Sequence, residues 1–331
     1  MAQMVKRAYK YRFYPTPEQA SELARTFGRV RYVYNKALAE RSRAYAQEGR
    51  KVSYAETSAM LTGWKRAQGL ELLSQVSCVP LQQALRHPQA AFAGFFAKRS
   101  KHPVFKSRKR SRASAEYTRS AFRRRDGELL LAKMDAPLDI VWSRPLPAGA
   151  QPSTVTVSRD AAGRWWVSIL VEETIRPLDP VEACVGVDAG ITSLVTLSTG
   201  EKIANPGHGR ADRRRDFLHK FSTRLVRDDQ TVVIEDLAVR NMVKNRSLAR
   251  AISDASWREL RAMLEYKPGW YGRRLVVVDR WFPSSKLCSA CGALRQSMPL
   301  RVREWACACG VIHDRDVNAA TNLLAAGLAE R

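Results

Sequence analysis

Four cysteines near the C-terminal end of the chain constrain its fold more than any other feature. They follow the pattern C-x2-C, fifteen intervening residues and C-x-C, with a glycine after each pair: Cys288, Cys291, Cys307 and Cys309. This spacing is typical of the two knuckles of a zinc ribbon. Because four thiolates complete the coordination sphere, we expect one structural Zn²⁺ that folds the hairpin without doing chemistry.

The other cysteine positions and one histidine qualify this prediction. The second knuckle is one residue shorter than the usual C-x2-C, so His313 is an alternative zinc ligand. Cys78 and Cys184 stand alone in the sequence. Such a distribution suits a reducing compartment and a metal site better than a disulfide framework, and it predicts a cytoplasmic location.

The charge of the chain indicates what it binds. Among 331 residues, 56 are basic and 32 acidic, which gives a formal net charge of +24. This excess repels itself unless a polyanion neutralises it, so nucleic acid is the expected partner. A membrane surface is the rival, but no apolar run approaches the roughly 20 residues of a spanning helix. The first residues also lack the apolar core of a secretion signal.

A basic segment between residues 98 and 125 is the candidate nucleic-acid surface. It contains twelve basic residues and one acid, Glu116. The interspersed aromatic residues Phe105, Tyr117 and Phe122 could stack on bases, whereas the alternative is an ordinary solvated loop. The basic residues that we expect to bind phosphate are Lys106, Arg108, Lys109, Arg110, Arg112, Arg123, Arg124 and Arg125.

The first half of the chain predicts helices between β-rich segments. A charged, aromatic strand opens the chain, and apolar residues then recur at helical spacing through Leu23, Phe27, Val30, Tyr34 and Leu38, with helices continuing to about residue 97. Residues 127–174 predict short strands that form an antiparallel barrel or sheet. The proline-containing segment 175–183 reads as a linker to a second domain.

The second half predicts a mixed α/β sheet. Residues 183–203 read as a β-hairpin, and two short apolar strands, at 231–234 and 275–278, follow after helical segments. A proline lacks the backbone N–H and its ring clashes with the preceding turn. We therefore expect the helix that precedes the last strand to kink or end at Pro268.

Three acidic residues fall at the ends of these predicted elements, where a sheet can bring them together: Asp188, Glu235 and Asp316. Carboxylates suit Mg²⁺, which prefers oxygen ligands, and two such ions about 4 Å apart would hold a scissile phosphate between them. Asp314 is better explained as a helix N-cap. Asp236 is an alternative to Glu235.

Five motifs then establish a resemblance. In order they are VGVDAGI (185–191), VIEDL (233–237), ISDASW (252–257), FPSSKLCSACG (282–292) and HDRDVNAATN (313–322), and the opening YKYRFYPTPEQ belongs with them. Together they resemble the TnpB family of transposon-associated nucleases, relatives of the type V CRISPR effectors. The resemblance covers nearly the whole chain.

The resemblance implies an architecture and a site. The fold would be α/β with all-β and helical parts: a RuvC-type RNase H fold (179–283 and 311–331), an inserted zinc ribbon (284–310), a β-barrel wedge domain (1–14 and 115–178) and a helical recognition domain inserted in the wedge (15–114). The family's catalytic triad matches Asp188, Glu235 and Asp316, which would hold two Mg²⁺ ions. Arg315 would contact phosphate.

The resemblance also implies partners and an activity. The partners are a guide RNA from the transposon end and a double-stranded DNA target, and the activity is cleavage of that target next to a short transposon-adjacent motif. The location is the cytoplasm of a prokaryote, with the protein associated with the nucleoid when it binds DNA. Whether the chain acts as a monomer or a homodimer is left open.

One departure from the family concerns residues 204–216, where a long basic helical stretch is reduced to a short segment. This shortening keeps open a cleavage-impaired, guide-RNA-dependent DNA-binding regulator. A directly acting transposase is the other alternative, because the same fold and acids can perform strand transfer.

Overall fold

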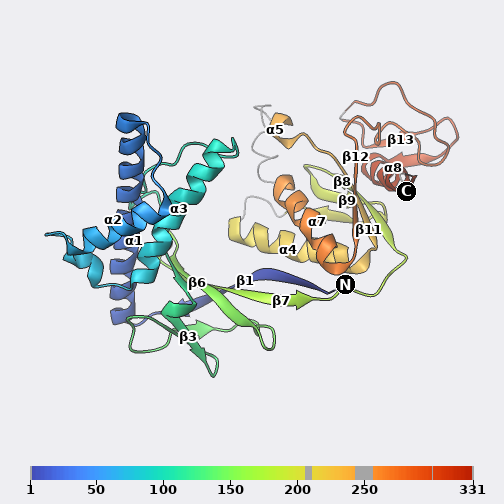
Figure 1. Ribbon diagram of the computed structural model, residues 1–331. Helices are drawn as coiled ribbons and strands as arrows, with labels where there is room; N and C mark the ends of the chain where they lie inside the picture. Colours follow the sequence, from blue (N-terminus) through green and yellow to red (C-terminus); the bar gives the residue numbers. More distant parts are fainter. Residues whose placement is uncertain (1, 206–210, 243–255, 300, 330–331) are drawn as a thin grey trace. The chain divides into compact units, whose positions relative to one another are not determined.

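The computed structural model describes residues 2–205, 211–242, 256–299 and 301–329 (Figure 1). The chain divides into two compact units, Met4–Glu173 on one hand and Thr174–Arg331 with Met1–Gln3 on the other. The boundary falls beside the predicted linker. Among the described residues no helix has the length and apolar character needed to cross a membrane.

The first unit is built on a five-stranded sheet of order β2-β6-β7-β1-β5. Its strands are β1 (Gln3–Tyr14), β2 (Ala113–Thr118), β5 (Asp139–Val141), β6 (Gln151–Arg159) and β7 (Trp165–Ile175). β3 (Phe122–Arg125) and β4 (Glu128–Leu131) pair as a separate hairpin. The predicted strands of this region are confirmed, and the closed barrel stays a prediction.

Three helices complete the first unit. α1 (Pro17–Glu48) begins with a capping box between Thr16 and Gln19 and ends at Gly49, which has a positive φ of 61°. The predicted apolar stripe of α1 is buried throughout. α2 (Tyr54–Arg66), the 3₁₀ turn η1 (Glu71–Ser74) and α3 (Cys78–Phe96) follow, and a second 3₁₀ turn, η2 (Arg119–Ala121), precedes β3.

The second unit contains a five-stranded sheet of order β10-β9-β8-β11-β12. The strands β8 (Cys184–Ala189), β9 (Ser193–Leu197) and β10 (Lys202–Ala204) form an antiparallel meander. The strands β11 (Thr231–Glu235) and β12 (Arg274–Val278) continue it in parallel with β8. The predicted mixed sheet is confirmed, with β10 as a third strand beyond the expected hairpin.

Helices cover both faces of this sheet (Figure 1). α4 (Ala211–Asp228) and α7 (Trp257–Tyr271) bury Leu218, Phe221 and Leu264 against Val185 and Val187 of β8. On the opposite face α8 (Arg315–Ala329) packs Leu323 against strands β11 and β12. A short helix, α5 (Val239–Met242), follows β11.

Two glycines let α8 lie directly on the strands. A Cβ added at Gly186 would overlap the carbonyl oxygen of Ala320 and lie 2.9 Å from the Leu324 side chain. A Cβ at Gly327 would lie 2.5 Å from Val233. The backbone of α8 therefore lies in direct contact with β8.

The helix α7 runs through Pro268 to Tyr271, so the predicted end at Pro268 is wrong, and the kink stays a prediction. The Pro268 carbonyl accepts hydrogen bonds from the backbone N–H groups of Gly272 and Arg273, which cap the final turn. The preceding Lys267 is buried and donates to the His219 carbonyl and the Ser222 hydroxyl of α4, each at 2.6 Å. Tertiary contacts thus hold the turn that an isolated helix would lose.

The cysteine hairpin carries two short strands, β13 (Glu304–Ala306) and β14 (Ile312–Asp314), paired antiparallel. β14 leads directly into α8. Two sequence observations lie partly outside the described residues. They are the ISDASW motif, of which residues 252–255 are not described, and the shortened segment 204–216, of which residues 206–210 are not described.

Candidate functional site

Asp188 and Glu235 lie at the same edge and on the same face of the second sheet. β8 and β11 are parallel neighbours, with Val187 opposite Ile234, so their carboxyl ends meet at one edge. Side chains alternate between the faces of a strand. Since Val187 and Ile234 face the core formed with α4 and α7, Asp188 and Glu235 face α8.

Asp316 comes to this face from the first turn of α8. Asp314 Oδ1 accepts the backbone N–H groups of Asp316 and Val317, each at 3.0 Å, so its predicted N-cap role is confirmed. The Lys202 ammonium binds the other oxygen of Asp314 at 2.5 Å. Burial opposes ionisation of Asp314, but Lys202 and the capping bonds outweigh it and lower its pKa.

The electrostatics of Asp188 depend on both other acids. Burial first, and then the negative charges of Asp316 and Glu235, hold the pKa of Asp188 well above its usual range, while Arg315 lowers it in part. Burial and the neighbouring Asp236 raise the pKa of Glu235. Such a cluster becomes fully ionised only when a cation compensates its charge.

Asp188 is the acid of the three whose pKa is raised by both others, after burial. Among the residues that the structure describes, however, only the four cysteines have their ligand atoms all within 4.8 Å of one another. The three carboxylates are therefore near each other but not gathered around one single-ion position.

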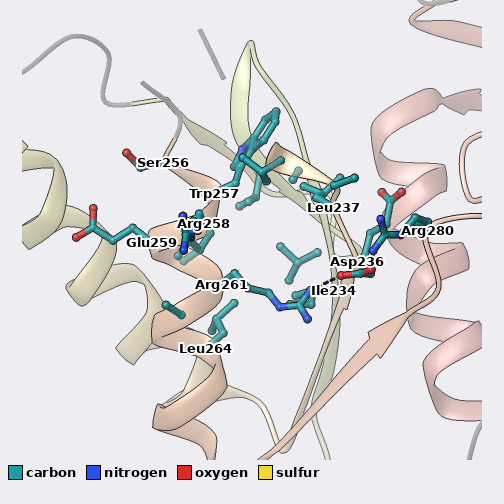
Figure 2. Close-up of a pocket in the computed structure, with 18 residues that line it drawn as sticks. Ile234, Asp236, Leu237, Ser256, Trp257, Arg258, Glu259, Arg261, Leu264 and Arg280 are labelled. Carbon is teal, nitrogen blue, oxygen red and sulfur yellow. Dashed lines mark hydrogen bonds and ion pairs between the residues drawn. The ribbon is translucent and has the colours of Figure 1, made fainter. Parts of the chain in front are cut away.

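Asp236, the alternative to Glu235, is engaged elsewhere. Its carboxylate binds Arg261 of α7 at 3.1 Å and also binds Arg280, which lies after β12 (Figure 2). The hydrogen bond from Arg280, aided by Arg261, lowers the pKa of Asp236. A carboxylate neutralised by two guanidinium groups has less need of a metal ion, so the geometry favours Glu235.

A cavity of about 990 Å³ lies between the end of β11 and α7 (Figure 2). Apolar side chains such as Ile234 and Leu264 line it, and its polar groups include the Asp236, Arg261 and Arg280 cluster together with Glu235. This volume lies at the upper end of the range of ligand-binding pockets.

The four predicted zinc ligands lie together. Cys288 Sγ lies 3.8 Å from Cys309 Sγ, and Cys291 Sγ lies 3.6 Å from Cys307 Sγ. Four sulfur atoms in this arrangement fit a closed tetrahedral Zn²⁺ site. His313, the alternative ligand, is outside this set of four; its Nε2 lies 3.0 Å from Cys288 Sγ.

The basic segment of the first unit presents most of its charges to solvent. The predicted phosphate-binding residues that are exposed are Arg108, Lys109, Arg110, Arg112, Arg123, Arg124 and Arg125. Lys106 differs from them, because its ammonium group lies 4.1 Å from the centre of the Tyr34 ring and burial lowers its pKa. Its charge therefore also serves the packing of this segment on α1.

The three aromatic residues of this segment have different places. Tyr117 is only 1% exposed and belongs to the core of the first unit, so its predicted stacking role is wrong. Phe122 is half-buried against the same core. Phe105 is 62% exposed and remains available for stacking. Phe96, which lies just before the basic segment, is 56% exposed and is available in the same way.

Two arginines near Asp316 have separate contacts. Arg315, the predicted phosphate contact, donates from Nη1 to the Pro299 carbonyl at 3.1 Å. Arg303, which precedes β13, places its Nη1 4.0 Å from Asp316 Oδ1. Sequence reasoning missed Arg303 because its approach to Asp316 depends on how the cysteine hairpin folds back onto α8.

Comparison with known families identifies both ends of the chain. A family model described as the Cas12f1-like TNB domain matches residues 257–323, which include the four cysteines and Asp316. A model of the IS605 OrfB group, described as a helix-turn-helix domain, matches residues 1–50. In this chain those residues form β1 and the single long helix α1.

Curated relatives match over almost the full length. A Streptomyces pristinaespiralis protein named "Putative RNA-guided DNA endonuclease" is 64% identical, over 99% of this chain and 91% of the relative. An Escherichia coli protein named "Putative RNA-guided DNA endonuclease InsQ" is 29% identical, over 97% of this chain and 92% of the relative. The first alignment spans 366 positions against 331 residues here, so part of that relative has no counterpart in this chain.

A solved structure shares the fold. The protein of a Cas12f1-sgRNA-target DNA complex matches with a TM-score of 0.55 at 13% sequence identity, over 97% of this chain and 98% of that chain.

Proposed function

The chain belongs to the TnpB family, whose curated relatives are named as RNA-guided DNA endonucleases, and on this premise we propose that it cleaves double-stranded DNA under the direction of a guide RNA. One observation carries the proposal: Asp188 and Glu235 stand at the ends of neighbouring parallel strands on the face covered by α8, and the first turn of α8 carries Asp316.

The strand order supports a RuvC-type RNase H fold for the nuclease. The sheet has the order β10-β9-β8-β11-β12, in which β10, β9 and β8 are antiparallel and β11 and β12 run parallel to β8. The first and fourth of these strands in chain order, β8 and β11, are therefore neighbours. This adjacency brings Asp188 and Glu235 together. The α8 helix then supplies the third acid from a segment that follows the zinc ribbon.

The donor set fits Mg²⁺. All three side chains offer carboxylate oxygens, and their mutual repulsion is relieved by divalent cations. We infer that Asp188, Glu235 and Asp316 would together hold two such ions. When bound, such ions would activate a water molecule and stabilise the leaving oxygen of the phosphodiester.

The remaining parts of the chain would bind and orient nucleic acid. In this proposal residues 1–14 and 115–178 form the wedge, 15–114 the recognition domain, 179–283 and 311–331 the RuvC-like nuclease and 284–310 the zinc ribbon. The exposed cations of the first unit would hold the guide RNA, and the protein would read a short transposon-adjacent motif while base pairing reads the rest of the target.

The central test is Asp188→Ala in the full chain purified with its RNA. Wild type with Mg²⁺ and a matched guide is expected to cut duplex DNA. The variant loses a metal ligand and with it several kcal/mol of transition-state stabilisation, or about 10³-fold in rate, whereas binding of RNA and target is expected to stay nearly unchanged.

The matched control is Asp216→Ala, since Asp216 is exposed on α4 and pairs only weakly with Lys220 at the surface. This variant is expected to cut like wild type. An Asp188→Ala protein that also cuts like wild type would show that the acid cluster is not the active site.

A second test addresses the RNA surface. Neutralising Arg108, Lys109 and Arg110 removes up to three phosphate contacts, so the slope of log K against log salt for RNA binding should fall by up to about three. An unchanged slope would place the RNA surface elsewhere. Sequencing the RNA that copurifies with the protein would identify the guide.

The cleavage-impaired regulator is the second candidate, and one observation favours it: the relative's alignment exceeds the length of this chain, in agreement with the shortened segment 204–216. Guide-dependent DNA binding by wild type without any cutting in Mg²⁺ would select this function over the nuclease.

A further inference from the structure

Strand β14 connects the cysteine cluster to the acid cluster. It ends at Asp314, the N-cap of α8, and Asp316 follows two residues later. Its central residue, His313, is 7% exposed. The His313 ring points toward Cys288.

His313 is held from two sides. Its Nε2 lies 3.0 Å from Cys288 Sγ, and its ring centre lies 4.8 Å from that of Trp305, its partner across the β13–β14 ladder. Cys288 is itself buried, at 1% exposure. A hydrogen bond between a buried ring nitrogen and a buried sulfur has no competition from water, so it fixes the position of β14 against the first knuckle.

The contacts of His313 differ from those of a metal ligand. The four cysteine Sγ atoms already lie within 4.8 Å of one another and fill a tetrahedral sphere without it. Groups that hydrogen-bond to a metal ligand orient it and tune its affinity for the metal. In the tautomer that carries its hydrogen on Nε2, the His313 ring would do this for the Cys288 thiolate.

The segment that follows His313 is also hydrogen-bonded to the cysteine hairpin. The Arg315 backbone N–H donates to the Arg303 carbonyl at 2.8 Å. Asn318 of α8 donates to the Leu287 carbonyl at 2.7 Å and accepts from the Ser289 backbone N–H at 3.0 Å. The first turn of α8, with Asp316, is thus attached to both sides of the cysteine hairpin.

We propose that His313 is a positioning residue: it donates a hydrogen bond to the zinc-bound Cys288 thiolate, and through β14 it couples zinc binding to the placement of Asp316. The first claim, the hydrogen bond to the zinc-bound Cys288, depends only on the cysteine cluster. The coupling part rests on the proposed function of Asp316 as a Mg²⁺ ligand.

The zinc part is tested with His313→Phe, which keeps an aromatic ring against Trp305 but removes the donor. Zinc transfer to a chromogenic chelator is expected to become about 10–100-fold more favourable, the usual effect of losing such a partner. His313→Gln, which retains an N–H donor, should recover part of the loss. Arg295→Ala is the control, because Arg295 contacts the Trp305 ring at 5.7 Å and no cysteine.

Substitution of the zinc by Co²⁺ decides whether His313 donates a hydrogen bond to Cys288 or binds the metal directly. The visible spectrum of the Co²⁺ protein should report four thiolates in wild type and in His313→Phe alike. A wild-type spectrum of three thiolates and one imidazole, lost in His313→Phe, would overturn the proposal. Equal zinc affinity in wild type and His313→Phe would overturn it as well.

The coupling is tested by calorimetric titration of the zinc-loaded protein with Mg²⁺, without any cleavage. His313→Phe is expected to bind Mg²⁺ about tenfold more weakly than wild type and Arg295→Ala. Unchanged Mg²⁺ binding in a variant with weakened zinc would refute the coupling. Absence of Mg²⁺ binding in wild type would instead refute the proposed metal site, and the zinc result would be unaffected.

Discussion

The cysteine cluster and the acid cluster lie on either side of β14 and are prepared for metal to different extents. The four sulfur atoms lie within 4.8 Å of one another, whereas the three carboxylates do not form such a set. Sulfur atoms can approach one another before an ion binds, whereas burial, and then the negative charges of Asp316 and Glu235, raise the pKa of Asp188. If the proposed metal sites are correct, the cysteine cluster would hold its ion permanently, whereas the Mg²⁺ affinity of the acid cluster would depend on pH and on the placement of its ligands.

The largest expected effect comes from Cys291→Ser. Structural zinc contributes about 10–16 kcal/mol in zinc-finger peptides, so the variant should lose its zinc and residues 284–310 should become sensitive to protease. Metal analysis and limited proteolysis measure both. If the variant retained one zinc per chain, the site would not depend on all four thiolates, and the contrast with the acid cluster would weaken.

The next effect concerns Glu235→Gln and its matched neighbour Asp236→Asn. The first should reduce cleavage about 10³-fold, because a metal ligand supplies several kcal/mol. The second removes partly exposed ion pairs worth about 0–1 kcal/mol, so its rate should stay within about fivefold of wild type. Single-turnover rates at saturating Mg²⁺ compare them. The reverse order would assign the metal to Asp236.

Asp188→Asn tests the electrostatic side of the comparison. A raised folded-state pKa means that protonated Asp188 contributes stability that is fully present below the unfolded pKa and is lost as pH rises through the folded pKa. Without Mg²⁺, the variant should therefore be more stable than wild type at pH 8 and similar at pH 4.

Thermal unfolding in zinc-containing buffer measures this difference, because the melting temperature changes by about 2–4 °C for each kcal/mol of unfolding free energy. Added Mg²⁺ should raise the melting temperature of wild type alone. A difference that shrinks as pH rises would contradict the assigned cause of the pKa shift.

The smallest effect is expected for Arg303→Ala. Its guanidinium lies 4.0 Å from Asp316, where it competes with a metal ion for the same carboxylate. A largely exposed pair contributes about 0–1 kcal/mol, so removal should tighten Mg²⁺ binding by up to about fivefold in a calorimetric titration. Weaker Mg²⁺ binding would show that Arg303 supports the site instead.

The cysteine cluster and the central acids could be predicted from local patterns. The C-x2-C and C-x-C spacing is a local property, and the strand patterns around Asp188 and Glu235 indicated where these two acids lie. The capping role of Asp314 follows from its position before a helix.

Features that depend on contacts between distant segments could not be predicted. Tyr117 occurs in a basic stretch, and only the pairing of β2 with β6, which puts it opposite Val155, shows that it belongs to the core. Pro268 is tolerated because α4 and the cap at Gly272 hold its turn. The hydrogen bond between His313 and Cys288 likewise exists only after the hairpin has folded.

Gly186 has a consequence for how such chains can change in length. It lets the backbone of β8 touch α8 at Ala320, so the separation of the first and last acids is set by this contact and by Gly327. This contact is made by β8 and α8 themselves and does not involve the surface segments that lie between the two acids in the chain. For the design of smaller variants of this chain, these two glycines are therefore positions to preserve.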